Sequence, residues 1–187
     1  MKRLLLIILL ICNVVFAQNT PLRPGDLLFF RDSEGMGGAV QESTGEYTHV
    51  AIAIDSVWTI DATPGDGVAL GLRYQGTGVK ADIYRLTIPF DTAAVVARAK
   101  SFIGQPYDNA FLPDNGAMYC SELVYECYLD SAGNHLFEAQ PMNWRDKQGN
   151  LPDYWKKHFE DLGTPVPEGV PGTNPTDMSR SPRLRKL

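Results

Sequence analysis

Apolar and β-branched residues gather in short runs along the first half of the chain, with turn-forming residues between them. Runs of this length, bounded by Gly, Pro, Asp and Ser, predict β-strands. Asp55-Ser56 separates two of the runs and predicts a hairpin at that point. The Gly-rich residues 35–45 are expected to form a loop with one helical turn, and residues 63–67 a turn. Strands are expected at residues 26–31, 48–54, 57–62 and 81–87.

Helical spacing dominates the second half of the chain. Asp91 can cap a helix over residues 91–103, and apolar side chains three and four apart predict another over residues 120–130. A last amphipathic helix is expected over residues 152–162. From residue 163 onward the chain is rich in Pro, Gly and Ser, and no secondary structure is expected there. The order of elements predicts an α+β fold with a small antiparallel sheet and segregated helices.

The N-terminus has the features of a secretory signal peptide. Lys2 and Arg3 precede an apolar stretch at residues 4–15, and Ala17 offers a small residue for cleavage. We expect an exported protein, periplasmic or extracellular, with a signal peptide at 1–17, a domain at 18–163 and a basic tail at 164–187. An uncleaved anchor remains an alternative. A lipid-modified Cys12 is disfavoured, because Ile11 stands where lipoprotein signals need a small residue.

The charge of the chain excludes one class of partner. The net charge is −5, and removal of Lys2 and Arg3 takes away two positive charges and leaves −7. Four further basic residues lie at positions 180, 183, 185 and 186, so residues 18–177 carry −11. An acidic domain of this kind lacks the positively charged surface that binding to nucleic acid requires. The basic tail is interpreted as a solvated end, with an anionic surface as the alternative.

Cysteine usage points to chemistry. After signal cleavage only Cys120 and Cys127 remain. On one helix they would lie roughly 10 Å apart at 1.5 Å per residue, which is too far for a disulfide. A free thiol in an exported protein is exposed to oxidation and therefore suggests a use. Cys127 is interpreted as a buried packing residue.

Cys120 stands where a loop ends and an amphipathic helix begins. Free backbone N–H groups and the helix dipole favour a thiolate at this position, and the same N–H groups can hold a developing oxyanion. A thiol nucleophile also needs a base. Of the three histidines, His135 lies in a polar turn and His158 on a lysine-rich helix face. His49 opens an apolar strand and is the leading base.

Asp61 is the candidate acceptor that would hold the tautomer of His49. It is a carboxylate within an apolar strand, twelve residues after the histidine. With a two-residue turn at Asp55-Ser56, residue 49 would face residue 62, and Asp61 would point to the other face of the sheet. An odd-numbered loop or one bulge would bring the pair face to face. The alternative is an Asp61 at the edge of the sheet, facing water.

No metal site is expected. The histidines are isolated, paired cysteine spacings are absent from the sequence, and Asp108 and Asp114 lack a calcium-loop pattern. No cofactor motif stands out, so the chemistry is expected to rest on the side chains alone.

Several motifs resemble a known family. The nucleophile segment of NlpC-type cell-wall peptidases, Gly-x-Pro-Tyr and then Asp-Cys-Ser-Gly-Leu-Val, is similar to Gly104-Gln105-Pro106-Tyr107-Asp108 and Tyr119-Cys120-Ser121-Glu122-Leu123-Val124. Their second half, a Gly-Asp-hydrophobic strand and then His-Val-Gly-Ile, is similar to Gly25-Asp26-Leu27-Leu28-Phe29-Phe30, Thr48-His49-Val50-Ala51-Ile52 and Ile60-Asp61-Ala62. Here the histidine half comes first. That order is the mark of the YiiX/YebB-like permuted papain-fold amidases and, distantly, of the lecithin:retinol acyltransferase family.

The resemblance covers about residues 22–130 and continues less specifically to about residue 160. It implies a circularly permuted papain-like fold in which a small sheet or half-barrel packs against helices. It also implies Cys120 as nucleophile, His49 as base and Asp61 as orienting residue. Ser121 and Tyr107 become candidates to line the oxyanion or substrate site.

Two departures from the peptidases bear on specificity. Tyr119 and Glu122 replace the Asp and Gly that flank the cysteine, so specificity for cell-wall peptides does not transfer directly. Asp61 also stands where many relatives have His or Glu. Met142, Trp144, Tyr154 and Trp155 offer an apolar wall for an acyl chain, or pack the last helix.

The function expected from the residues and the resemblance together is amide hydrolysis through an acyl-enzyme on Cys120. The substrate would be an envelope-derived peptide or a lipid-linked amide. The rivals are lipid acyl transfer or thioester cleavage by the same chemistry, a non-catalytic binding module that retains the cleft, and a structural envelope protein whose tail docks a partner.

Overall fold

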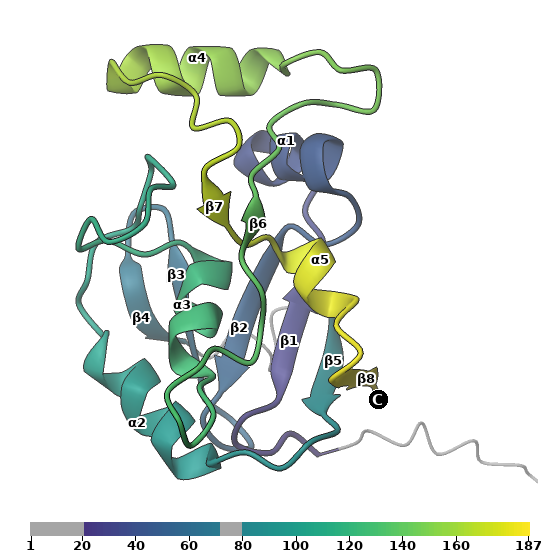
Figure 1. Ribbon diagram of the computed structural model, residues 1–187, viewed down its shortest axis with the longest axis vertical. Coiled ribbons are helices and arrows are strands. Elements are labelled where there is room, and N and C mark those ends of the chain that lie inside the picture. The colour runs from purple at the N-terminus through teal and green to yellow at the C-terminus, as the bar shows by residue number, and fades with distance from the viewer. Residues whose placement is uncertain (1–20, 72–79) are drawn as a thin grey trace, which may run out of the picture.

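The computed structural model describes residues 21–71 and 80–187. A six-stranded antiparallel sheet in the order β4-β3-β2-β1-β5-β8 forms the base of the molecule (Figure 1). The signal peptide predicted at residues 1–17 lies outside the described residues. Within residues 21–71 and 80–187, no helix combines the length and apolar character needed to cross a membrane. The strands of the sheet are Leu27–Phe30 (β1), His49–Ala53 (β2), Thr59–Thr63 (β3), Gly67–Gly71 (β4), Ala81–Leu86 (β5) and Leu184–Lys186 (β8).

Four strands of the main sheet confirm the sequence prediction, and two, β4 and β8, were not predicted. β1, β2, β3 and β5 lie within one or two residues of the predicted runs. The prediction for residues 63–67 missed that a new strand, β4, begins at Gly67 and pairs with β3. Gly67 has a φ of 65°, and a Cβ there would come within 2.2 Å of the Gln105 carbonyl oxygen. A glycine is therefore needed where the chain turns into β4.

Two helices cover one face of the sheet. α2 (Thr92–Ser101) and α3 (Cys120–Cys127) pack against each other, and α3 also contacts β2 and β3. Asp91 caps α2 as predicted, since its carboxylate accepts from the Ala94 N–H at 2.9 Å. The main core lies between these helices and the alternating inward residues of the strands. Its fully buried members include Leu27, Phe29, Val50, Ile52, Ile60, Leu123, Val124 and Cys127.

The prediction for residues 35–45 was wrong, because they form a full helix, α1 (Gly35–Thr44). Its glycines disfavour a helix by propensity, but they allow a close approach of the chain. A Cβ on Gly37 would lie 2.7 Å from the Asp32 Cβ, and one on Gly38 would lie 2.7 Å from the Ser33 carbonyl oxygen. The tight entry into α1 therefore requires glycine, and tertiary packing overrides the propensity.

α1 packs against α4 (Asp153–Leu162) at the end of the molecule away from α2 (Figure 1). Trp155 of α4 is 1 % exposed, and its indole N–H donates to the Ala39 carbonyl at 3.3 Å and to Ser43 Oγ at 3.2 Å. The helix predicted at residues 152–162 is confirmed. Together with Phe111, Trp144 and Phe159, this tryptophan forms a second apolar cluster that is distinct from the main core.

The expectation that the residues after 163 lack secondary structure was also wrong. β7 (Pro171–Gly172) pairs with β6 (Gln140–Pro141), and α5 (Pro175–Ser179) follows. β8 then pairs with β5 and adds the last strand to the main sheet. Asn174 caps α5 by accepting from the Asp177 N–H at 2.8 Å, and Pro175 is its first residue. The basic residues of this segment therefore lie on an ordered part of the fold.

Candidate active site

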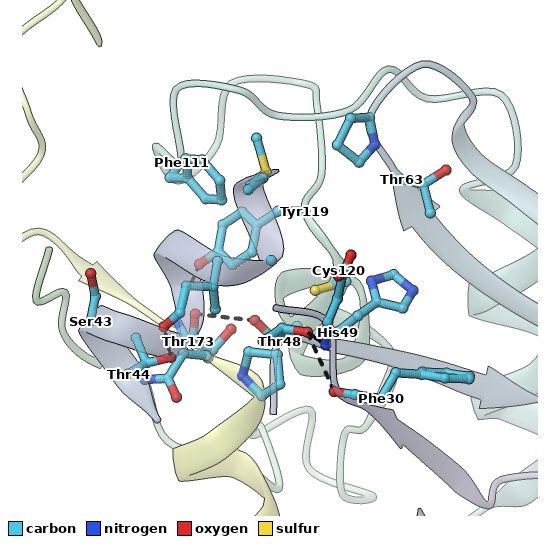
Figure 2. Close-up of a pocket in the computed structure, with 18 of the residues that line it drawn as sticks. Phe30, Ser43, Thr44, Thr48, His49, Thr63, Phe111, Tyr119, Cys120 and Thr173 are labelled. Carbon is cyan, nitrogen blue, oxygen red and sulfur yellow. Dashed lines mark hydrogen bonds between the residues drawn. The ribbon is translucent and has the colours of Figure 1, made fainter. Parts of the chain in front are cut away.

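A cleft of about 650 Å³ opens where α1, the ends of β1 to β3 and the first turn of α3 come together. Cys120 and His49 both line it, and Figure 2 shows their side chains next to each other. Residues 173–175 form another part of the wall. The cleft is therefore built from segments that lie far apart in the sequence.

Cys120 is the first residue of α3, and Tyr119 is the N-cap. The N-terminal turn is held by two hydrogen bonds. The Tyr119 N–H donates to Glu122 Oε2 at 3.3 Å, and the Leu123 N–H donates to the Tyr119 carbonyl at 3.0 Å. The remaining N–H groups of a first helical turn have no intrahelical acceptor, and the helix dipole places positive charge there. Cys120 is 7 % exposed, so its sulfur sits at the floor of the cleft in an environment that favours an anion.

His49 is the first residue of β2 and lies against the sulfur. Burial lowers the pKa of His49, but the negative charge of Cys120 and the hydrogen bonds with Asp61 and Cys120 outweigh it and raise the pKa to about 10. Asp61 occupies Nε2, which leaves Nδ1 as the ring nitrogen available for an interaction with Cys120. The arrangement favours the imidazolium form of His49.

Asp61 meets His49 by way of an odd-numbered loop. β2 and β3 pair at Ile52–Ile60 and Ala53–Thr59, and the Ile54 N–H donates to the Trp58 carbonyl. Three residues, 55–57, therefore form the turn. Residues 49 and 61 consequently lie on the same face of the sheet. His49 Nε2 lies 2.6 Å from Asp61 Oδ2, and Asp61 is only 3 % exposed. The alternative of a water-facing Asp61 is wrong.

The three-residue turn has a local cause. Asp55 Oδ1 accepts from the N–H groups of Val57 and Trp58, both at 2.7 Å. An Asp side chain that bonds to the backbone two and three residues ahead stabilises a turn of this kind. The residue type at position 55 therefore sets the register that brings His49 and Asp61 to one face.

Tyr107 lines the same cleft as Cys120. Its hydroxyl donates to Met36 Sδ at 3.5 Å, and its pKa is raised well above the ordinary value by burial and then by the charge of Cys120. The loop that carries it is fixed by Asp108, which accepts from the N–H groups of Ala110 at 2.8 Å and Leu112 at 2.7 Å. Tyr107 is thus a neutral hydroxyl within the electrostatic reach of Cys120.

Ser121 also lines the cleft, but its side chain has another partner. The hydroxyl donates to the Thr173 carbonyl at 3.1 Å, and the residue is 1 % exposed. What Ser121 can offer to an oxyanion is therefore its backbone N–H in the first turn of α3.

The other candidate side chains lie apart from the cleft. Cys127 is fully buried in the main core, and burial raises its pKa to about 12, which fits a packing role. His135 stacks on Tyr125, with ring centroids 3.7 Å apart. His158 Nε2 lies 2.7 Å from the Asn109 carbonyl oxygen. Neither histidine lines the cleft.

One wall of the cleft is apolar. Of the residues predicted as a possible acyl wall, three line it, whereas Tyr154 is 38 % exposed and does not. Sequence reasoning missed the contributions of α1, because residues 35–45 were expected to form a loop. The residues of the second apolar cluster that form this wall include Met36, Val40, Phe111, Met142, Trp144 and Trp155.

Sequence reasoning also missed Thr173, Asn174 and Pro175 as lining residues. A signal for them was present. Asn174-Pro175 with Asp177 has the form of a helix start, with a capping residue, proline at the first position and an acid in the first turn. Because the overall composition of this segment resembles that of a tail, composition alone predicts no secondary structure there.

A cysteine at a helix N-terminus that meets a histidine on an antiparallel sheet is the arrangement of papain-like cysteine hydrolases, and here the histidine strand precedes the cysteine helix. The chain belongs to the permuted papain-like amidases of the YaeF/YiiX, C92 family, whose model matches residues 21–187. The enzyme is therefore a cysteine amidase- or peptidase-type hydrolase.

Two relatives support the family and the fold. The uncharacterized protein YiiX of Escherichia coli K12 is 23% identical over 200 residues, which cover 98% of this chain and 93% of that protein. A crystal structure described as the metalloprotein YiiX from Escherichia coli O157:H7 matches with a TM-score of 0.71 and 22% identity, over 88% of this chain and 96% of that one. The predicted fold, α+β and permuted papain-like, is confirmed.

The description of that crystal structure raises the question of a metal in this chain. Among residues 21–71 and 80–187, no group of three or more His, Cys, Asp or Glu side chains is arranged to hold a metal ion.

Proposed function

We propose that this protein hydrolyses an amide bond through an acyl-enzyme on Cys120. The thiolate attacks the carbonyl carbon and forms a C–S bond, while the carbonyl oxygen takes up negative charge. As the tetrahedral species collapses, the C–N bond breaks and the His49 imidazolium gives its proton to the leaving amine. His49 then accepts a proton from water, which attacks the thioester, and the acid and the Cys120 thiolate are released.

The observation that carries this proposal is the position of the Cys120 side chain beside that of His49 in the cleft (Figure 2). A nucleophile and a proton carrier within hydrogen-bonding reach meet the geometric requirement for both halves of the reaction. Asp61 would orient the imidazole ring through Nε2. The N–H groups of the first turn of α3 and the Tyr107 hydroxyl would hold the oxyanion.

The apolar wall of the cleft supports a substrate whose acyl part is apolar. Met36, Val40, Phe111 and Trp144 stand together on it, and burial of a hydrocarbon chain there would contribute about 0.8 kcal/mol per methylene. We favour a lipid-linked amide over an envelope peptide. The apolar stretch at residues 4–15 supports export to the periplasm or beyond, with cleavage near Ala17.

The same apolar wall favours one second candidate, transfer or release of a lipid acyl group from an ester or thioester. The acyl-enzyme would form in the same way, and a nucleophile other than water could accept the acyl group. A non-catalytic binding module is disfavoured, because it has no need of a buried thiol held against a histidine.

Acyl-enzyme trapping separates these candidates. Full-length protein is mixed with matched amide and ester probes that carry the same long apolar acyl group, and intact mass is recorded over time. Amide hydrolysis predicts an adduct on Cys120 with both probes, whereas an adduct with the ester alone would contradict the amidase proposal. Cys120→Ala should form none, and Cys127→Ala should behave like the wild type.

Iodoacetamide alkylation provides a test that needs no substrate. An ordinary thiol ionises near pH 8.5, so its reaction slows about tenfold for each pH unit below that. We expect Cys120 to react at pH 6 at a rate close to that at pH 8, and Cys127 to stay unmodified in the folded protein. Slow alkylation of both cysteines at pH 6 would favour the binding module.

A further inference from the structure

The C-terminal segment contacts the chain on both sides of the proposed catalytic pair. Residues 173–176, named here the C-terminal strap, run from β7 into the first turn of α5, and the first three of them line the cleft (Figures 1 and 2). They follow Cys120 by more than fifty positions in the sequence. The strap is thus a C-terminal segment that completes the wall of a site formed mainly by residues earlier in the sequence.

Thr173 binds both sequence neighbours of Cys120. Its N–H donates to the Tyr119 hydroxyl at 3.0 Å, and its carbonyl accepts from Ser121 Oγ at 3.1 Å. All three residues are buried. The residues before and after the nucleophile are therefore tied, through their side chains, to the backbone of one residue in the strap.

Thr176 binds the segment that leads into His49. Its Oγ1 accepts from the Tyr47 N–H at 2.9 Å and donates to the Tyr47 carbonyl at 3.0 Å, and Thr176 is 1 % exposed. Tyr47 lies two residues before His49 and is held at its other end, where its hydroxyl lies 2.6 Å from Asp82 Oδ2. One hydroxyl thus satisfies both backbone groups of a residue just outside β2.

The two sets of contacts lie three residues apart in one short segment. Asn174 and Pro175 connect them, and the cap and first residue of α5 restrict the backbone between them. The strap therefore joins the nucleophile helix to the histidine strand by a rigid link. The helix and strand also pack directly through apolar side chains, and apolar packing lacks the directionality that the hydrogen bonds of the strap add.

We propose that the C-terminal strap is a positioning element of the active site, with Thr173 and Thr176 as positioning residues that hold Cys120 and His49 in contact. The inference rests on the proposed function. It assigns the strap no contact with the reacting atoms. Its role is to keep sulfur and imidazole at the separation at which the proton can be shared.

Thr176→Val is the most direct test, since it removes the hydroxyl while it keeps the shape of the side chain. Iodoacetamide alkylation of Cys120 is measured from pH 5.5 to 9 in the full chain. We expect the rate at pH 6 to fall roughly tenfold or more, because small misplacements at a reacting centre have effects of this size. The rate at pH 9 should change much less, because there an ordinary thiol is ionised without help. Thr176→Ser keeps the hydroxyl and should restore the profile.

Thr59→Val is the matched control. Thr59 is also fully buried, and its Oγ1 donates to a distant backbone carbonyl, that of Gly71, at 3.2 Å. A second pair compares Tyr119→Phe with Tyr128→Phe. Both hydroxyls make buried hydrogen bonds with backbone groups that lie far away in the sequence. Tyr128, however, is the C-cap of α3, and its hydroxyl donates to the Gly25 carbonyl at the end of the helix opposite to Cys120. Urea unfolding of each variant shows how much stability each change costs.

The outcomes separate the two proposals. Rapid alkylation of the wild type at pH 6, with Thr176→Val slowed and Thr59→Val unchanged, supports the positioning role. If the wild type reacts rapidly at pH 6 and both Thr176→Val and Thr59→Val react equally fast, only the positioning role is overturned. If the wild type itself is slow at pH 6, the proposed function fails.

Discussion

His49 Nε2 and Asp61 Oδ2 lie 2.6 Å apart, although the two residues are not opposite each other in the β2–β3 ladder. Continuing the register of Ile52–Ile60 places residue 63 across from His49 and residue 61 across from Ala51. The pair is therefore diagonal on one face, a separation that side chains of this length can bridge. The diagonal contact leaves Nδ1 for the sulfur.

Replacing Asp61 tests its orienting role. A hydrogen bond to a charged group contributes about 1.5–3 kcal/mol, so Asp61→Asn should lower the rate of acyl-enzyme formation by roughly 10-fold to 150-fold. Asp55→Asn removes a charge from the same hairpin but keeps the Oδ1 acceptor that holds the three-residue turn, so it should leave the rate near that of the wild type. Single-turnover mass spectrometry with the amide probe gives both rates. Equal rates for the two variants would contradict the orienting role.

The pKa of His49 sets the alkaline limit of activity. Burial lowers it, but the charge of Cys120 and the bond to Asp61 raise it to about 10, so the imidazolium persists through neutral pH. The group that protonates the leaving amine should then be lost only as pH rises through about 10. We expect kcat/KM for an amide to hold across neutral pH and to fall near pH 10.

Asp61→Asn should move that alkaline limb to lower pH, because one of the contributions that raise the pKa of His49 is removed. The measurement is kcat/KM from pH 6 to 11 for both proteins. An alkaline limb that stays in place in the variant would show that Asp61 does not act on His49 in solution.

Glu122 makes stability depend on pH. The pKa of its carboxyl is raised from 4.5 to about 8, mainly by burial. The hydrogen bond from the Tyr119 N–H lowers this pKa, and the negative charge of Asp108 raises it further. The folded state therefore binds this proton more tightly than the unfolded state does. The stability that this proton contributes is present below pH 4.5 and is lost as pH rises through 8.

Glu122→Gln should remove this dependence and keep an acceptor for the Tyr119 N–H. The free energy of unfolding of the wild type should fall between pH 5 and pH 8 by up to about 1.4 kcal/mol per pH unit relative to the variant. Urea titrations at both pH values measure it. Glu126→Gln, on the more exposed side of the same helix, removes only one of the smaller contributions that raise the pKa of Glu122, and as the control it should keep most of the slope of the wild type.

Trp155 joins α4 to α1 at the apolar end of the cleft. Trp155→Ala should lower the free energy of unfolding by about 3–5 kcal/mol, the usual cost of removing a large buried aromatic. The neighbouring Tyr154 is 38 % exposed, so Tyr154→Ala should cost much less. Chemical denaturation followed by circular dichroism compares the two. Similar losses would mean that α4 is not held by this side chain.

Local patterns were enough to predict much of the fold. Apolar and β-branched runs predicted β1, β2, β3 and β5. Apolar spacing predicted α3, and together with Asp91 and Pro152 at the helix starts it predicted α2 and α4, because these elements are specified by their own periodicity. The candidates Cys120 and His49 followed from the few free thiols and histidines in the chain and from where each stands on its element. The permuted order of motifs predicted the family.

Tertiary structure decided what composition could not. Gly37 and Gly38 disfavour α1 in isolation, yet the close approach of residues 32–33 requires them. Residues 164–187 carry the composition of a tail, but pairing with β5 and β6 orders them. The register of a hairpin turn put Asp61 on the same face of the sheet as His49. Thr173 and Thr176, near the end of the chain, contact the sequence neighbours of Cys120 and the segment before His49. Such contacts depend on distances between segments far apart in the sequence, and no local pattern encodes those distances.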